Sequence, residues 1–301
     1  MKRICSSCSL SQSLNIRDKG EKRMSKDVFG DRMKKYEYVT RTYLTTRTPV
    51  IIRIDGKAFH TFTKGFKKPF DIVLVKSMQQ TMQYLCANIQ GCVLGYTQSD
   101  EITLVLVDYK KIDTCPWFDY NIQKCASIAA SIATMAFNKF FKNNIEEFRE
   151  ASLNNWYEGA INRGLFIEEP EKLKLFETYC KASRSGAMFD ARVFNIPKEE
   201  VANCILWRQN DATRNSIEMV GQAYFSQSSL QGKSCNQIQD MLMLEKGINW
   251  NDFSTTLKRG SCCIRKQVDG SDRGKWTIDN NIPFFRAENR SYINDLIFCG
   301  E

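Results

Sequence analysis

Histidine is nearly absent from this chain, since His60 is the single one among 301 residues. Sites that need two histidines are therefore excluded, and at most one nucleophile–histidine pair could form. Long apolar runs are absent as well, because no stretch reaches the ~20 apolar residues that a transmembrane helix needs. We therefore expect no membrane-spanning segment and no membrane partner.

A second cysteine pair at zinc spacing is also lacking, although the chain has twelve cysteines. Cys5 and Cys8 form the single C-x-x-C pair, and Cys262 and Cys263 are adjacent, which suits chelation of one ion poorly. Scattered cysteines of this kind indicate small, buried, apolar residues in a reducing compartment. We therefore expect a cytoplasmic protein.

The first 17 residues contain no acidic residue but hold three basic residues and five serines. No apolar segment follows them, so a secretory signal is not expected. An organellar transit peptide over residues 1–23 would also fit, and the protein would then be mitochondrial. Met24 is an alternative start of the folded protein. With either start, residues 1–26 are predicted to be a disordered leader.

The remaining composition is that of a soluble globular protein, with 43% hydrophobic and 26% charged residues. The net charge of +9 suits a polyanionic partner such as a nucleic acid, and it also suits plain solubility.

Two short apolar runs that meet acidic residues are the most informative feature. The run 50–55 ends in Asp55 and is followed by Gly56, and the corner 95–101 brings Asp100 and Glu101 to the start of the run 102–107. Carboxylates at the ends of neighbouring strands are suited to Mg²⁺, which prefers hard oxygen ligands. The alternative is that these acids are solvated loop ends.

The loop 56–69 interleaves aromatic residues with lysines. This mixture suits a nucleotide, because aromatic rings stack on a base while ammonium groups contact phosphates. A solvated basic loop with aromatic anchors is the alternative.

The order of elements predicts the fold. We expect a helix over 27–46, strands over 50–55, 92–97, 102–107 and 189–196, and helices starting after the N-cap Asp71, at about 120–142 and from Pro197 to about 224. This is the ferredoxin-like pattern of an α+β polymerase palm, an antiparallel sheet with helices on one face. The palm would span 27–225 with an insertion at about 143–188. Residues 226–301 would add helices and a hairpin, 261–268 and 275–279.

The helix before residue 225 contains the polar run 207–216. So long a polar run is not expected in a core. Arg208, Asp211 and Asn215 share one helix face, which is predicted to be either solvated or turned toward a substrate groove.

Together these stretches resemble the tRNA-His guanylyltransferase family, enzymes that add nucleotides in the 3′–5′ direction. The resemblance covers about 29–268 and rests on segments in family order: Arg53-Ile54-Asp55-Gly56 with Phe59-His60, Lys68-Pro69 with Asp71, Gln98-Ser99-Asp100-Glu101, Phe189-Asp190-Ala191-Arg192, Trp207-Arg208-Gln209 with Asp211, Leu230-Gln231-Gly232, and Lys258-Arg259-Gly260.

The resemblance implies a two-Mg²⁺ palm that uses ATP and GTP as substrates. Its metal ligands would be Asp55, the Gly56 carbonyl, Asp100 and Glu101, with the three carboxylates catalytic. Strand alternation turns neighbouring side chains to opposite faces, so Asp100 is favoured over Glu101 as the direct ligand. The nucleotide pocket would comprise Arg53, Phe59, His60, Lys68, Asp71 and Ser99. The residues that would contact tRNA are Arg208, Asp211, Arg214, Asn215, Lys233, Lys258 and Arg259.

One departure points to a branch of the family. Eukaryotic guanylyltransferases carry a His-Ile-Asn-Asn-type motif where this chain has the segment 213–216, without histidine. The chain is thus similar to the Thg1-like proteins, which repair tRNA 5′ ends by templated addition. Non-templated guanosine addition to histidine tRNA is the alternative, and a palm-fold cyclase or a non-catalytic tRNA-binding protein are remoter ones. The resemblance also implies a homo-oligomer, a tetramer.

Overall fold

A computed structural model describes residues 27–163, 170–267 and 274–299, with backbone alone for 153–163 and 170. The predicted leader 1–26 lies outside the described residues. The chain divides into two units, the first ending at Arg41 and the second starting at Thr42. In the first unit, α1 (Val28–Tyr38) is capped by Asp27, whose side chain accepts a hydrogen bond from the Gly30 amide.

The first helix is shorter than predicted, because we expected it to reach residue 46. It ends at Tyr38, before a segment rich in β-branched threonines. Such residues lose side-chain freedom in a helix. Tyr43 instead forms a β-bridge with Asn121, which draws this part of the chain into the second unit.

The second unit is built around an antiparallel sheet, which has six strands in the described part of the chain, in the order β4-β1-β3-β2-β5-β6. The strands are β1 (Val50–Gly56), β2 (Cys92–Gln98), β3 (Glu101–Leu106), β4 (Phe189–Asn195), β5 (Ser261–Lys266) and β6 (Lys275–Asp279). The first four have the predicted ferredoxin-like arrangement. The β5–β6 hairpin pairs with β2, so the C-terminal part extends the palm sheet.

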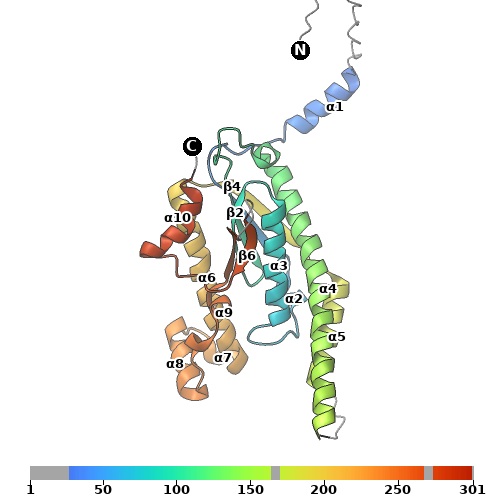
Figure 1. The fold of residues 1–301 in the computed structure, drawn as a ribbon, viewed down its shortest axis with the longest axis vertical. Coiled ribbons are helices and arrows are strands. Elements are labelled where there is room, and N and C mark those ends of the chain that lie inside the picture. Colours follow the sequence, from blue (N-terminus) through green and yellow to red (C-terminus); the bar gives the residue numbers. More distant parts are fainter. Residues whose placement is uncertain (1–26, 164–169, 268–273, 300–301) are drawn as a thin grey trace, which may run out of the picture. The chain divides into compact units, whose positions relative to one another are not determined.

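Helices α3 (Ile72–Asn88) and α4 (Ile122–Arg163) cover one face of this sheet (Figure 1). Ile52 and Ile54 from β1 are buried there with Met82 and Phe137 from these helices. The Asp71 carboxylate caps α3, as predicted. Helix α4 continues well past the predicted end at 142, so the insertion begins as its extension and goes on as α5 (Pro170–Ser185).

The opposite face of the sheet is covered as well, by α6 (Lys198–Tyr224) and α10 (Ser291–Ile297) (Figure 1). Ile51 and Val105 point to this side and pack with Val201 and Ile205 of α6. The expected helical layer on the first face is present, and α6 forms a second layer. The remaining elements are α2 (Phe59–Phe62), α7 (Gln227–Leu230), α8 (Cys235–Lys246), α9 (Thr255–Arg259) and 3-10 turns at Trp117–Tyr120, Trp250–Asp252 and Ala287–Arg290.

The polar run of α6 is more buried than its sequence indicates. Arg208, Gln209, Ala212 and Ser216 are buried, which corrects the expectation that this run lies outside the core. Gln209 and Ser216 form hydrogen bonds, and Arg208 pairs with two carboxylates, which makes their burial tolerable. The Arg208 Nε nevertheless lacks hydrogen-bond geometry to its ion-pair partner Glu101. No helix of the described part of the chain combines the length and apolarity that crossing a membrane requires.

Candidate active site

Two carboxylates meet at one edge of the sheet. Asp55 lies near the end of β1, directly opposite Glu101 of β3 in the antiparallel register. Asp100 lies in the two-residue turn between β2 and β3. Ser99 has a left-handed backbone, with φ at 49°, as tight hairpin turns require. Its hydroxyl donates a hydrogen bond to the Asp100 carboxylate at 3.0 Å.

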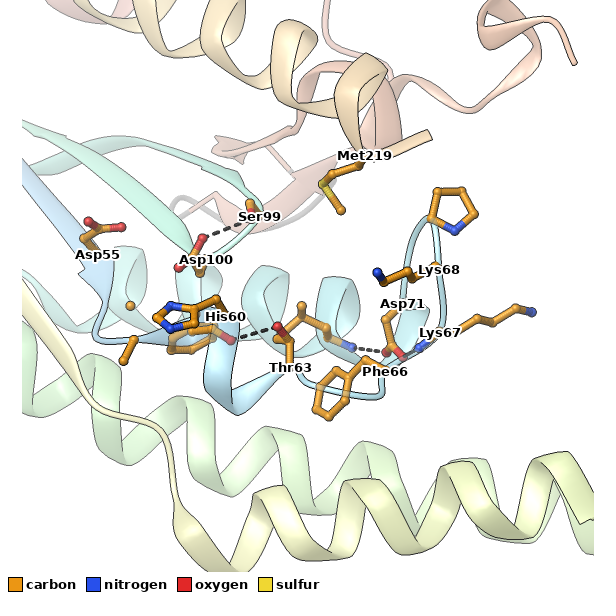
Figure 2. Close-up of a pocket in the computed structure, with 15 residues that line it drawn as sticks. Asp55, His60, Thr63, Phe66, Lys67, Lys68, Asp71, Ser99, Asp100 and Met219 are labelled. Carbon is orange, nitrogen blue, oxygen red and sulfur yellow. Dashed lines mark hydrogen bonds between the residues drawn. The ribbon is translucent and has the colours of Figure 1, made fainter. Parts of the chain in front are cut away.

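A pocket of about 480 Å³ opens beside these carboxylates (Figure 2). Asp55, Asp100 and His60 lie at one end of it, and Lys67 and Lys68 lie at the other (Figure 2). The Lys68 side chain points toward the carboxylate end, whereas that of Lys67 points away (Figure 2). The lining also includes Gly56, Ala58, Phe59, Thr63, Phe66, Pro69, Asp71, Leu74, Ser99 and Met219. A cationic end facing an acidic end suits a Mg²⁺–triphosphate.

The electrostatics of the carboxylate end favour a bound cation. Burial and, less strongly, the neighbouring Asp55 raise the pKa of Asp100, whereas the Ser99 hydrogen bond lowers it. A divalent cation would offset the repulsion between the two carboxylates. Among the described residues no cluster of three or more metal-binding side chains occurs. Two carboxylates and the Gly56 carbonyl nevertheless fit Mg²⁺, which keeps several positions for water and substrate phosphates.

Lys67 and Met219 line the pocket but were not predicted as site residues from the sequence. Lys67 could have been predicted, because it belongs to the basic-aromatic loop 56–69. Met219 could not, since it reaches the pocket from α6 and is more than a hundred residues from the acidic turn in sequence. Long-range packing alone brings it there.

A family model described as tRNAHis guanylyltransferase, Thg1, matches residues 30–197. The chain belongs to the Thg1 family. Its fold and its enzyme class are therefore those of a nucleotidyltransferase. The predicted ferredoxin-like palm and the predicted enzyme class are both confirmed.

Solved structures of Thg1 proteins resemble this chain over most of its length. A bacterial Thg1-like protein in complex with ATP is 39% identical, with a TM-score of 0.72 over 90% of this chain and 99% of the other. A bacterial Thg1-like protein in complex with GTP is 36% identical, with a TM-score of 0.70 over 90% and 100%. The tRNA(His) guanylyltransferase of Debaryomyces hansenii is 26% identical over 77% of this chain and 80% of its own.

Phe59 supports the wall of the candidate active-site pocket by packing behind it. Its side chain is buried, and its ring lies 5.1 Å from those of Phe62 and Phe189. A Cβ on Gly56 would lie 2.2 Å from the Phe59 ring, so only glycine fits at this position. The predicted nucleotide contact of Phe59 therefore stays a prediction, and the structure gives its ring a packing role.

Asp71 is also engaged by the protein itself. Its carboxylate accepts hydrogen bonds from the Lys67 amide at 3.0 Å, the Leu74 amide at 3.0 Å and the Tyr179 hydroxyl at 2.6 Å. The residue is 5% exposed. It lines the pocket, but these bonds occupy its oxygens in structural contacts.

Two predicted site residues lie outside the pocket. Glu101 and Arg53 face α6, where the Glu101 carboxylate forms an ion pair with Arg208, at 2.8 Å from its Nε. The Arg53 guanidinium lies 5.5 Å from the Trp207 ring centroid. Burial raises the pKa of Glu101, and the charges of Arg208 and Arg53 oppose this rise. Asp100 lines the pocket from the turn, whereas Glu101, the first residue of β3, is turned to α6; the alternation argument applies to regular strand and does not extend to Asp100 in the turn.

The residues predicted to contact tRNA have varied environments. Arg208 is buried and Asp211 joins it in an ion pair, so neither presents a free charge to RNA. Arg214 is exposed and pairs with Asp211. Asn215 and Arg259 line a small cavity of about 70 Å³ next to Ser99. Lys233 is exposed, and Lys258 donates a hydrogen bond to the Asn251 carbonyl. Their tRNA contacts stay predictions.

Proposed function

We propose that this nucleotidyltransferase adds nucleotides to tRNA 5′ ends in the 3′–5′ direction, copying the opposite strand, and so repairs truncated tRNAs. The pocket that joins Asp55 and Asp100 to Lys68 carries the proposal, because it provides a metal end and a phosphate end in one cavity. Identities of 39% and 36% to bacterial Thg1-like proteins, against 26% to a fungal guanylyltransferase, support this branch.

The proposed reaction has two steps. The tRNA 5′-phosphate attacks the α-phosphate of ATP, and pyrophosphate leaves. The 3′-hydroxyl of the incoming nucleotide then attacks the activated 5′-phosphate, and AMP leaves with the bonding electron pair. A tRNA that already carries a 5′-triphosphate needs the second step alone, with pyrophosphate as the leaving group.

The residues of the pocket have separate tasks in this reaction. Asp55, the Gly56 carbonyl and Asp100 would hold Mg²⁺, which in two-metal sites lowers the pKa of an attacking hydroxyl and neutralises charge on a leaving group. Lys68 would bind the triphosphate. His60, at the carboxylate end, would contact the base or ribose.

The experiment that tests the function compares two tRNA substrates with ATP, GTP and Mg²⁺. One is a transcript that lacks its first nucleotide, and the other is a full-length histidine tRNA. We expect the missing nucleotide to be restored when it pairs with the opposite base, at a rate well above guanosine addition to the full-length tRNA. Preferred extension of the full-length tRNA would instead assign non-templated guanylyltransfer. Cyclic nucleotide formation without RNA would overturn both.

Replacement of Lys68 by Met should weaken nucleotide binding. We expect KM for the nucleoside triphosphate to rise about tenfold with kcat nearly unchanged, because one charge–phosphate contact of about 1.4 kcal/mol is lost from ground and transition state alike. Steady-state kinetics over a range of nucleotide concentrations measure this. Lys67→Met is the matched control, since that side chain points away from the carboxylates and should change KM less. Equal effects of both would remove the assigned role of Lys68.

A further inference from the structure

A buried arginine connects α6 to the strand that follows the catalytic turn. Arg208 and Glu101 form an ion pair at 2.8 Å, with side chains 7% and 12% exposed. The same guanidinium also pairs with Asp211, one turn along the helix. A planar guanidinium can hold two carboxylates in fixed directions, which an ammonium group cannot. Arg208 therefore has a defined orientation relative to both α6 and β3.

The position of Glu101 in the chain makes this contact relevant to Asp100. The two residues are adjacent, and the turn between β2 and β3 contains just Ser99 and Asp100. Asp100 lines the pocket, and Glu101 faces α6. Because the two residues are adjacent, a displacement of the Glu101 backbone also displaces the Asp100 backbone. The left-handed Ser99 shows that the turn needs a particular backbone conformation. A fixed Glu101 thus restricts where the Asp100 carboxylate can lie.

The helix end of this connection is rigid. Helix α6 packs on the sheet through Val201 and Ile205, both fully buried. Next to Arg208, the Gln209 side chain donates to the Pro283 carbonyl at 2.9 Å and accepts from the Phe285 amide at 3.0 Å. Because α6 is well packed, Arg208 holds Glu101 in place, and this restrains the turn that carries the Asp100 carboxylate.

We infer that Arg208 is a positioning residue for the metal-binding Asp100, and that Glu101 is the anchor through which it acts. This inference rests on the proposed function. It replaces two expectations from the sequence, a tRNA contact for Arg208 and direct metal ligation by Glu101. A positioning contact of this kind changes metal affinity or activity by about 10- to 100-fold when removed, as outer-shell partners of metal ligands generally do.

The test compares two substitutions at Glu101 with one at Arg208. Glu101→Gln keeps the shape of the side chain and an oxygen beside the Arg208 guanidinium while removing the charge, and should lose about tenfold or less in kcat and in Mn²⁺ affinity. Glu101→Ala and Arg208→Met both break the contact, and each should lose about 10- to 100-fold with little change in nucleotide KM. Mn²⁺ affinity is measured by EPR on full-length protein without substrate, so this readout needs no turnover.

Gln209→Met is the matched control for general destabilisation of α6. The substitution removes the hydrogen bonds of the Gln209 side chain to Pro283 and Phe285 and does not alter the β2–β3 turn. The melting temperature of the variant should therefore fall while its Mn²⁺ affinity stays at the wild-type value. Equal Mn²⁺ loss in Gln209→Met and Arg208→Met would overturn the positioning role. Equal, large losses in Glu101→Gln and Glu101→Ala would overturn the anchor and restore Glu101 as a ligand. A wild-type protein that binds Mn²⁺ but extends no tRNA would refute the proposed function and leave this inference standing.

Discussion

Asp100→Asn is expected to lower kcat for nucleotide addition by about a thousandfold or more. The substitution removes one of two carboxylates that would hold Mg²⁺, and each tenfold in rate corresponds to about 1.4 kcal/mol of transition-state stabilisation. A lost contribution of several kcal/mol from metal binding therefore gives a loss of this size. Single-turnover extension of truncated tRNA measures it.

The same substitution should leave the fold intact or make it slightly more stable. Burial raises the pKa of Asp100 in the folded protein, so the folded state disfavours the charged form near neutral pH. A raised pKa of an acid lowers stability above that pKa, and this penalty disappears as the pH falls and the group is protonated. Asn removes the penalty. The melting temperature of Asp100→Asn should thus equal or exceed that of the wild type at pH 7, and the difference should shrink on acidification.

Asp113→Asn serves as the control for loss of an aspartate charge. Asp113 is exposed in the loop after β3, away from the residues that line the pocket. The rate of nucleotide addition by Asp113→Asn should stay within about twofold of the wild-type rate, because surface substitutions away from special features have small effects. A near-normal rate for Asp100→Asn would remove Asp100 from the metal site.

Asp71→Ala is expected to destabilise the fold by about 2–4 kcal/mol. It removes the N-cap of α3, worth about 0.5–2 kcal/mol. It also leaves the buried Tyr179 hydroxyl without its acceptor, which costs a further ~1–3 kcal/mol. Urea denaturation should show a lower midpoint with an unchanged slope.

Tyr179→Phe separates the two contributions of Asp71. It removes the donor and keeps the N-cap, so we expect a smaller cost of about 1–2 kcal/mol. Its KM for nucleotide should not change, since Tyr179 does not line the pocket beside Asp55 and Asp100. An Asp71→Ala protein with wild-type stability and a raised KM would show that Asp71 mainly binds nucleotide, as the family resemblance implies.

The amino-acid sequence by itself determined the palm and its acidic edge. The apolar runs of β1 and β3 predicted buried strands, and Asp71 was predicted to cap α3, because the patterns that indicate strands and helix ends are local in sequence. Asp55 and Asp100 were predicted to meet because acidic residues border both runs. The preference for Asp100 over Glu101 as a metal ligand rested on strand alternation, but Asp100 lies in the turn before β3, so its direction is set by the turn.

Tertiary structure decided the roles of the residues between these elements. Arg208 looks like a surface cation in sequence, yet α6 packs on a second face of the sheet and buries it against Glu101. Asp71 looks like a nucleotide contact, yet Tyr179, about a hundred residues away in sequence, occupies its carboxylate. A polar side chain becomes structural when a distant residue satisfies its hydrogen bonds and charge, and that pairing depends on how the layers pack, which no local pattern encodes.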